Sequence, residues 1–341
     1  MWRALCVCVC DWLCLLFAPH RWCCAHHSPL SSLTHPLAQE PGELEGELLC
    51  GLSGINLCCD VFGAHSAGEV AAGLCFHGEA GLTTWEVREA DRAAGTVTLA
   101  AHLRRSELEV SRTFSLDGAV LSMAETLTNL AGFERALGRA QHVTVGDKFM
   151  DGGCSFRASC DKGMTWPEDE DPDGSLGSKW KPATAFEYPD LPLREGGTES
   201  WCEYPRNEKS SDLATMRVSP GEEHGWFVAE RAAAEGAGAG TPRLAFATAW
   251  ERATFPWLMT WEENRSRASL PWAGKTLCRG LEISSYAFAT SKRDNVERGS
   301  LFDTPCFEWL DANEAKSTVL RLSLQAVSGE ESKTGLELVG L

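Results

Sequence analysis

The sequence predicts an all-β fold with few short helices, and three features of the chain indicate it. Residues 95–103 alternate apolar and polar side chains with a period of two, the pattern of a half-buried strand. Residues 108–116 repeat this pattern, and Asp117-Gly118 then leads into a third alternating run that ends near Leu127. An Asp-Gly pair between two such runs predicts a β-hairpin. With 341 residues, 43% of them apolar, the chain can bury a substantial β core.

Later runs extend the same architecture. Further strands are expected at residues 225–230, 243–250, 257–261, 277–286 and 319–327. Only residues 291–301 suggest a short helix, and the alanine-glycine stretch 230–240 predicts a loop. Residues 164–197 are dense in proline, aspartate and glycine, so we expect a long excursion over the surface there. No internal repeat is visible, and we expect a single sandwich domain over residues 46–341.

The predicted hairpin carries two charges on its apolar face. If Asp117 and Gly118 form the turn, residue 110 faces 125 and residue 112 faces 123, so Arg112 and Glu125 are diagonal neighbours. A lone charge on that face would be costly to bury, whereas a paired charge is tolerated. We therefore expect a structural Arg112–Glu125 ion pair in preference to a contact with a substrate.

The first 45 residues differ from the rest of the chain. Residues 4–17 form an apolar run that is too short to span a bilayer, and Asp11 within it argues against a secretory signal. Residues 28–47 are rich in proline, serine and glutamate, a composition that resists folding on its own. We expect residues 1–45 to be a cysteine-rich leader, disordered or used for targeting. The localisation stays open, with the cytoplasm favoured over a secreted or organellar site.

The cysteines divide into two groups. Nine of the 15 precede residue 60, with spacings that match no zinc pattern. Cys23, Cys24, His26 and His27 could hold a metal, but a leader without a metal is the simpler interpretation. The six later cysteines are scattered and are expected to be reduced core residues: Cys75, Cys154, Cys160, Cys202, Cys278 and Cys306.

The charge balance limits the partners. The formal net charge is -17, from 31 basic and 48 acidic residues. An acidic average surface repels phosphate backbones and anionic membranes. We therefore expect no nucleic-acid partner and no membrane partner, whereas a neutral small molecule remains acceptable.

Three local phrases carry residues with useful chemistry. They are Phe76-His77-Gly78-Glu79 with Trp85, then Thr128-Asn129-Leu130 followed by Gln141-His142-Val143-Thr144-Val145-Gly146, and finally Arg279-Gly280-Leu281-Glu282-Ile283-Ser284. In order and spacing, over roughly residues 74–310, these phrases resemble the galactose mutarotase-like (aldose 1-epimerase) superfamily. The resemblance implies a β-supersandwich fold and an isomerase that interconverts sugar anomers.

The resemblance also implies a role for each residue. His142 would protonate the ring oxygen, Glu282 would take the proton from the anomeric hydroxyl, and His77 would contact sugar hydroxyls. Glu282 lies between Leu281 and Ile283 in an apolar strand, so its side chain points away from theirs, towards solvent or the concave face of a sheet. Each residue also has a plainer interpretation: a histidine bonded within a core strand, an exposed strand glutamate and a turn histidine.

The chemistry of anomer exchange suits these residue types. A proton must leave the C1 hydroxyl while another reaches the ring oxygen, after which the open aldehyde rotates and closes. An ionised glutamate and a protonated histidine suffice, so we expect no metal and no cofactor. Trp257 and Trp261 are expected to contact the substrate because indole faces pack against the C–H faces of a pyranose, while most other tryptophans lie in the core. The expected ligand is a small sugar, a hexose or a derivative.

Two departures from the family pattern leave an alternative open. The family places an asparagine-arginine pair upstream of the His-Gly phrase, and residues 60–73 contain neither residue. The aspartate that commonly positions a sugar hydroxyl from a middle strand also has no evident counterpart. A non-catalytic carbohydrate-binding protein of the same fold is therefore the alternative. A metal-dependent hydrolase has little support, since no clustered histidine and carboxylate spacing occurs. His142 and Glu282 within reach of one sugar would favour the enzyme, and a wide separation would favour the binding protein.

Overall fold

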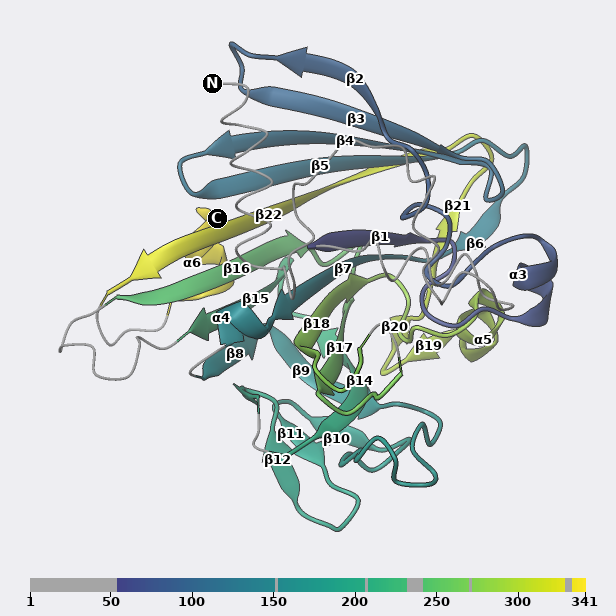
Figure 1. Ribbon diagram of the computed structural model, residues 1–341. Coiled ribbons are helices and arrows are strands. Elements are labelled where there is room, and N and C mark those ends of the chain that lie inside the picture. Colours follow the sequence, from purple (N-terminus) through teal and green to yellow (C-terminus); the bar gives the residue numbers. More distant parts are fainter. Residues whose placement is uncertain (1–53, 151–152, 206–207, 232–241, 270–271, 329–332) are drawn as a thin grey trace.

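The computed structural model describes residues 54–150, 153–205, 208–231, 242–269, 272–328 and 333–341. The expected leader, residues 1–45, and most of the expected loop 230–240 lie outside these ranges. Two large antiparallel sheets dominate the described residues, and the helices are short (Figure 1). The all-β prediction is confirmed.

The first sheet has seven strands and carries the candidate site. Strand order is set by pairings between segments far apart in the chain, so residues distant in sequence become neighbours. The order is β1 (Ile55–Cys59), β7 (Arg139–Gly146), β18 (Leu277–Ser284), β17 (Trp257–Asn264), β14 (Ser210–Val218), β9 (Cys160–Thr165) and β10 (Ala185–Glu187).

The second sheet has nine strands and includes the predicted hairpin. Its order is β13 (Glu203–Tyr204), β8 (Cys154–Ala158), β15 (His224–Arg231), β16 (Arg243–Glu251), β22 (Ala315–Val327), β5 (Val120–Asn129), β4 (Leu108–Asp117), β3 (Thr96–Leu103) and β2 (Glu86–Asp91). Three two-stranded ribbons complete the described strands: β11 (Asp190–Pro192) with β12 (Thr198–Ser200), β19 (Ser300–Leu301) with β20 (Thr304–Pro305), and β21 (Glu308–Leu310) with β6 (Arg135–Leu137).

The described helices are short, and the last of them packs against β15, β16 and β22 of the nine-stranded sheet. They are α3 (Ala67–Ala71), α4 (Asp147–Met150), α5 (Lys292–Arg298) and α6 (Gly335–Val339). The predicted helix at 291–301 is confirmed as α5, where Ser291 caps the first turn by accepting from the backbone N–H of Asp294. Among the described residues, no helix is long and apolar enough to cross a membrane.

The main core lies between the two sheets. Val143, Leu281 and Ile283 of the seven-stranded sheet pack in one cluster with Met123 and Leu322 of the nine-stranded sheet. Because side chains alternate along a strand, the neighbours of these apolar residues point to the other side of the seven-stranded sheet. We call that side the outer face.

The hairpin prediction is right in kind and wrong in register. Asp117 pairs with Val120, so Gly118 and Ala119 form the turn, and Arg112 faces Glu125 directly instead of diagonally. The observed turn lies one residue later in the sequence than the predicted turn, because β4 continues through Asp117. The expected ion pair is present, with Arg112 Nη2 lying 2.8 Å from Glu125 Oε2.

This ion pair belongs to a buried network beneath the candidate site. Arg112 also donates to Gln141 Oε1 (2.7 Å), and Gln141 donates to Glu125 Oε2 (2.9 Å). Arg139 contributes contacts to Glu125 (3.2 Å) and Glu308 (2.9 Å). Buried charges that are paired and hydrogen-bonded in this way are tolerated. The network ties strand β7, which carries Arg139 and Gln141, to the nine-stranded sheet.

Residues 164–197 are more integrated than expected. Strand β10 pairs with β9 and so extends the seven-stranded sheet, and Trp180 and Phe186 are buried in the main core. The expectation that this segment lies wholly on the surface was wrong, because the side chains of Trp180 and Phe186 pack in the main core. The six later cysteines carry thiols, and all but Cys202 are buried, as expected.

Candidate active site

His142 and Glu282 are direct cross-strand neighbours. Strand β18 pairs with β7 so that Glu282 faces His142, and both side chains point to the outer face. His142 Nε2 lies 3.1 Å from Glu282 Oε1. A possible acid and a possible base therefore stand within hydrogen-bond reach of each other.

His77 joins this pair from a loop. Its ring packs edge-on to that of His142, with centroids 5.2 Å apart and an interplanar angle of 88°. The backbone N–H of Gly63 donates to His77 Nδ1 (3.1 Å), so this nitrogen is an acceptor and the proton of the neutral ring sits on Nε2. His77 has a left-handed backbone (φ 62°), which turns the chain sharply at this point. The three residues named from the sequence thus converge.

Burial sets the protonation of the site. It raises the pKa of Glu282 well above the ordinary carboxyl value, because the charged form loses its hydration. It lowers the pKa of His142 to about 4 for the same reason. The pKa of His77 is also lowered well below its usual value, by burial and by the neighbouring His142. Both shifts favour the uncharged forms, and the 3.1 Å contact between His142 Nε2 and Glu282 Oε1 needs one proton between the two atoms.

Glu282 has one carboxylate oxygen without a partner. Its Oε1 faces His142, whereas Oε2 is buried and has no hydrogen-bond partner among the described residues. A buried acceptor without a donor costs free energy, on the order of 1–3 kcal/mol. A ligand hydroxyl that donated to Oε2 would recover that cost.

Several neighbours of the pair were not recognised from the sequence. Thr144 Oγ1 lies 3.2 Å from His142 Nδ1, so it holds the ring by the nitrogen opposite Glu282. Asn56 is the cross-strand partner of His142 on β1, and Cys58 Sγ lies 3.2 Å from His77 Nδ1. The alternation of β7 could have indicated Thr144, since residues two apart share a face. Asn56 and Cys58 required knowledge of the β1–β7 pairing.

Gly280 leaves space beside the glutamate. It lies two residues before Glu282 on the same face of β18. A Cβ at this position would lie 2.6 Å from Glu282 Oε1, closer than real Cβ contacts occur. The absence of a side chain at Gly280 therefore allows the observed position of the Glu282 carboxylate.

The two tryptophans named from the sequence differ in their settings. Trp257 is fully buried, and its indole N–H donates to the Pro305 carbonyl (2.8 Å) within an apolar cluster. Trp261 is half-buried on the outer face, directly across from Gly280. Of the two, Trp261 is placed beside the pair with part of its surface open.

The pair itself is nearly closed off from solvent. His142 is 8% exposed and Glu282 1% exposed. Phe76 and Phe62 pack around His77, with ring centroids 4.0 and 5.9 Å from it, and His77 in turn covers His142. A ligand can reach the pair only if the segment that carries these rings moves. Within the described ranges, no three His, Cys, Asp or Glu side chains are grouped to hold a metal ion.

Comparison with solved structures identifies the fold. A proposed aldose 1-epimerase of Klebsiella pneumoniae subsp. pneumoniae MGH 78578 matches with a TM-score of 0.57 and 14% identity, over 84% of this chain and 66% of that protein. A proposed aldose 1-epimerase of Escherichia coli K12 matches with a TM-score of 0.54 and 15% identity, over 84% and 88% of the two chains. A galactose mutarotase-like protein of Clostridium acetobutylicum matches with a TM-score of 0.50 and 15% identity, over 80% of each chain.

These likenesses are structural. No protein-family model and no curated protein sequence matches the chain. The architecture of this chain is the galactose mutarotase-like β-supersandwich, as the resemblance implied.

Proposed function

We propose that this protein is an aldose 1-epimerase-like isomerase, which interconverts the anomers of a sugar by acid/base ring opening. The observation that carries the proposal is the contact between His142 and Glu282, whose facing atoms are 3.1 Å apart. The galactose mutarotase-like fold is consistent with it.

One adjacent pair can serve both proton transfers. The ring oxygen and the anomeric hydroxyl are both bonded to C1, so an acid and a base that lie side by side can address them together. Glu282 takes the proton of the C1 hydroxyl, the bond between C1 and the ring oxygen breaks, and His142 gives a proton to that oxygen. The open aldehyde rotates about the bond from C1 to C2, and the reverse transfers close the ring in the other anomeric form.

Sugar binding would prepare the charges that this chemistry needs. In the closed site the pair holds one proton, and the raised pKa of Glu282 favours the neutral carboxyl. A sugar hydroxyl that donates to the unpartnered Glu282 Oε2 stabilises the carboxylate and lowers its pKa. The shared proton then moves to His142 Nε2, which leaves an ionised base and a protonated acid facing C1. His77, displaced from His142 on entry of the sugar, would bind another hydroxyl.

Two substitutions test the assignment. Glu282→Gln and His142→Asn are each expected to reduce the anomerisation rate by about a hundred-fold or more, because each removes a proton-transfer group and keeps a similar volume. In the double variant the losses should be less than additive, since one group without its partner leaves half of the reaction uncatalysed. The rate is measured by NMR on freshly dissolved α-anomers.

The chain offers a matched control on the other sheet. His102 on β3 faces Glu109 on β4, where His102 is exposed and Glu109 half-buried. His102→Asn and Glu109→Gln make the same chemical changes away from the site and should leave the rate unchanged. Full activity in Glu282→Gln and His142→Asn would show that the site assignment is wrong.

One observation favours a second function, sugar binding without turnover. Burial holds both members of the pair in neutral forms and closes them from solvent, which is compatible with a site that has stopped turning over. A wild-type protein that binds aldoses and accelerates the anomerisation of none would establish this alternative.

A further inference from the structure

The strands on the two sides of the His142–Glu282 pair present different side chains to it. On the Glu282 side, Met259 of β17 faces Glu282 and is 1% exposed. On the His142 side, Asn56 of β1 faces His142 and is half-buried. Residues directly opposite each other on paired strands point to the same side of a sheet, so all four side chains belong to the outer face. Asn56 is therefore the polar neighbour of the pair.

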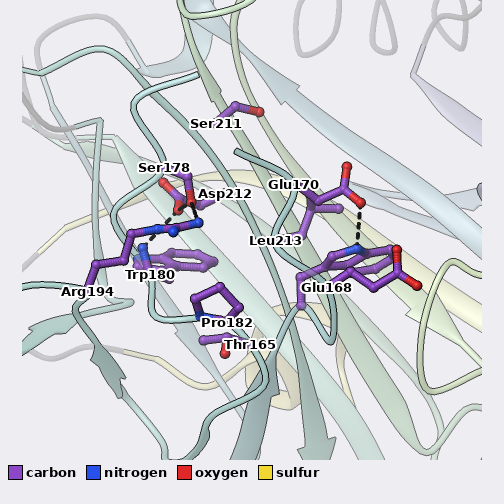
Figure 2. A pocket seen from close by; sticks show the side chains of 11 residues that line it. Thr165, Glu168, Glu170, Ser178, Trp180, Pro182, Arg194, Ser211, Asp212 and Leu213 are labelled. Atoms are coloured by element: carbon purple, nitrogen blue, oxygen red, sulfur yellow. Dashed lines mark hydrogen bonds between the residues drawn. The ribbon is translucent and has the colours of Figure 1, made fainter. Parts of the chain in front are cut away.

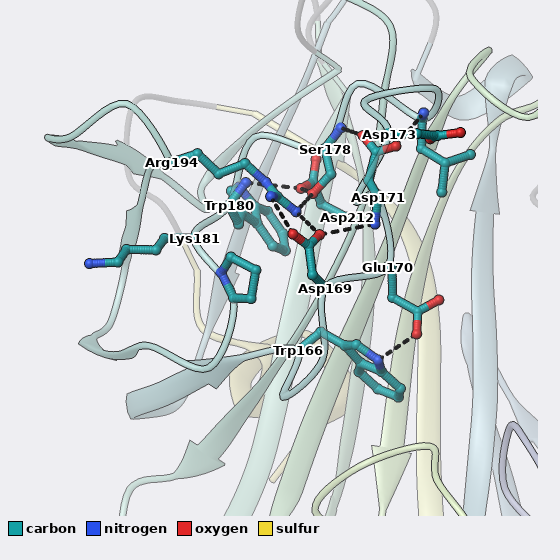
Figure 3. Close-up of polar contacts among 12 residues, drawn as sticks. Trp166, Asp169, Glu170, Asp171, Asp173, Ser178, Trp180, Lys181, Arg194 and Asp212 are labelled. Carbon is teal, nitrogen blue, oxygen red and sulfur yellow. Dashed lines mark hydrogen bonds and ion pairs between the residues drawn. The ribbon is translucent and has the colours of Figure 1, made fainter.

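Beyond β17, the space beside β14 is filled by the segment that follows β9. The Trp166 backbone N–H donates to Leu213 O (3.0 Å), and the Trp166 indole N–H donates to Glu170 Oε1 (2.9 Å). Ser178 Oγ donates to Asp212 Oδ1 (2.8 Å), so the polar groups of this segment bind one another or β14 (Figure 3). The cavity that remains measures about 20 Å³, room for one water molecule and not for a sugar ring (Figure 2). This leaves the β1 side of the pair for further contacts to a sugar.

Asn56 has hydrogen-bonding capacity that the protein does not use. Its amide carries two N–H groups and an oxygen with two lone pairs. Among the described residues, its side chain makes one hydrogen bond, from Nδ2 to Cys58 Sγ (3.6 Å), and a thiol sulfur is a weak acceptor. Cys58 Sγ in turn lies 3.2 Å from His77 Nδ1, in the loop that covers the pair. When that loop moves to admit a sugar, the Asn56 amide can exchange its weak contact for a sugar hydroxyl.

The order of the three side chains matches the order of atoms in a pyranose. In the proposed reaction, Glu282 acts on the C1 hydroxyl and His142 acts on the ring oxygen, which joins C1 to C5. A path from the C1 hydroxyl through the ring oxygen continues to C5 and its substituent, which in a hexose is C6 with its hydroxyl. A path across the sheet from Glu282 through His142 continues to Asn56, one strand spacing of ~4.8 Å further on. The C6 hydroxyl thus comes within reach of the Asn56 amide.

We propose that Asn56 binds the C6 hydroxyl of the substrate, so that the preferred substrates are aldohexoses with a free hydroxyl at C6. Sugars that lack this hydroxyl leave the amide with its weak contact to Cys58, and they are poorer substrates. The statement about substrate preference rests on the proposed isomerase function, whereas binding of the hydroxyl by Asn56 does not.

Sugars that differ only at C6 test the proposal. D-galactose is compared with D-fucose and D-glucose with D-quinovose, because the second sugar of each pair lacks only the C6 hydroxyl. With the wild type, kcat/KM for anomerisation should be about three- to tenfold higher for the hexose in at least one pair, as expected for one hydrogen bond between uncharged groups. Equal values within both pairs would overturn the proposal.

A variant shows whether Asn56 is responsible for the preference. Asn56→Leu removes the amide and keeps a similar branched shape, so the ratio of kcat/KM within the pair should fall to about one. Thr126→Val is the matched control, since it also exchanges a half-buried polar side chain for an apolar one of similar shape, on β5 of the other sheet. It should retain the wild-type ratio. A wild-type ratio in Asn56→Leu would show that another group binds the C6 hydroxyl and would overturn the proposal.

A spectroscopic measurement covers the case in which Asn56→Leu does not fold. In proton–nitrogen NMR of the wild type, the side-chain amide signals of Asn56 should shift on titration with the hexose and shift much less with its partner that lacks the C6 hydroxyl. Shifts of equal size with both sugars would overturn the proposal.

Failure of the isomerase proposal gives a different result. If the wild type accelerates the anomerisation of none of the four sugars, calorimetry measures their binding. Tighter binding of a hexose than of its partner, with the difference lost in Asn56→Leu, would retain the role of Asn56 and reject the isomerase. Equal binding within both pairs, or no binding, would reject the role of Asn56.

Discussion

Gly280→Ala should damage catalysis by moving the Glu282 carboxylate. The added Cβ would lie 2.6 Å from Glu282 Oε1, and ordinary contact begins at 3.4 Å, so the oxygen must move by 3.4 − 2.6 = 0.8 Å. That displacement is large compared with the tolerance of the 3.1 Å contact to His142. Because a misplacement of about 1 Å can cost about a hundred-fold in rate, we expect kcat to fall by roughly thirty- to a hundred-fold.

The assay is NMR or polarimetry on freshly dissolved α-anomers, together with thermal unfolding. Gly280 has no left-handed backbone, so alanine is compatible with the strand and the fold should persist. Gly221→Ala is the matched control, since its added Cβ would meet nothing within 4 Å. A folded Gly280→Ala variant with wild-type kcat would refute the claim that the position of Glu282 controls the reaction.

Three further predictions concern pH and the leader. The plot of kcat/KM against pH should show a broad plateau. On the acid side kcat/KM falls near pH 4, because His142 takes up a proton there, the pair then holds two protons and no base remains. On the alkaline side kcat/KM falls when the pair loses its shared proton, at the raised pKa of Glu282. An acid limb near pH 6.5 would contradict the burial of His142. The pKa of His142 falls from 6.5 to about 4 on folding, so the folded state binds fewer protons and this residue removes about 3 kcal/mol of stability as the pH drops from 6.5 to 4. Urea unfolding at pH 6.5 and pH 4 measures the free energy of unfolding of each protein. It should decrease less between these pH values for His142→Asn than for the wild type, and an equal decrease would contradict the lowered pKa of His142. Deletion of residues 1–45 should leave Tm nearly unchanged, whereas a large drop would show that the leader contributes to the core.

Strand positions were predictable because alternation is a local property. Residues 95–127 predicted β3, β4 and β5 within a few positions. The predicted register between β4 and β5 differs from the observed one by two residues, because the register depends on whether Asp117 belongs to the strand or to the turn. The helix at Lys292–Arg298 was also local, since its serine cap and short amphipathic run adjoin each other in sequence.

The meeting of His142 and Glu282 was not a local property. Each could be placed on a strand, but their contact depends on the pairing of β7 with β18, two strands that lie far apart in the sequence. Only the family resemblance indicated it. Likewise, Trp257 and Trp261 are four residues apart on β17, so alternation places both side chains on the same face of the strand. Tertiary packing alone decides that the indole N–H of Trp257 is donated to Pro305 inside a core.

The most direct measurement of the central claim follows the anomeric protons of freshly dissolved α-aldoses by NMR, with the wild type and with Glu282→Gln at equal concentration. The account predicts that the wild type accelerates equilibration of at least one aldose well above the rate in buffer, and that Glu282→Gln loses about a hundred-fold or more of that acceleration. Equilibration at the buffer rate with the wild type for every aldose tested, or equal acceleration by the two proteins, would contradict it.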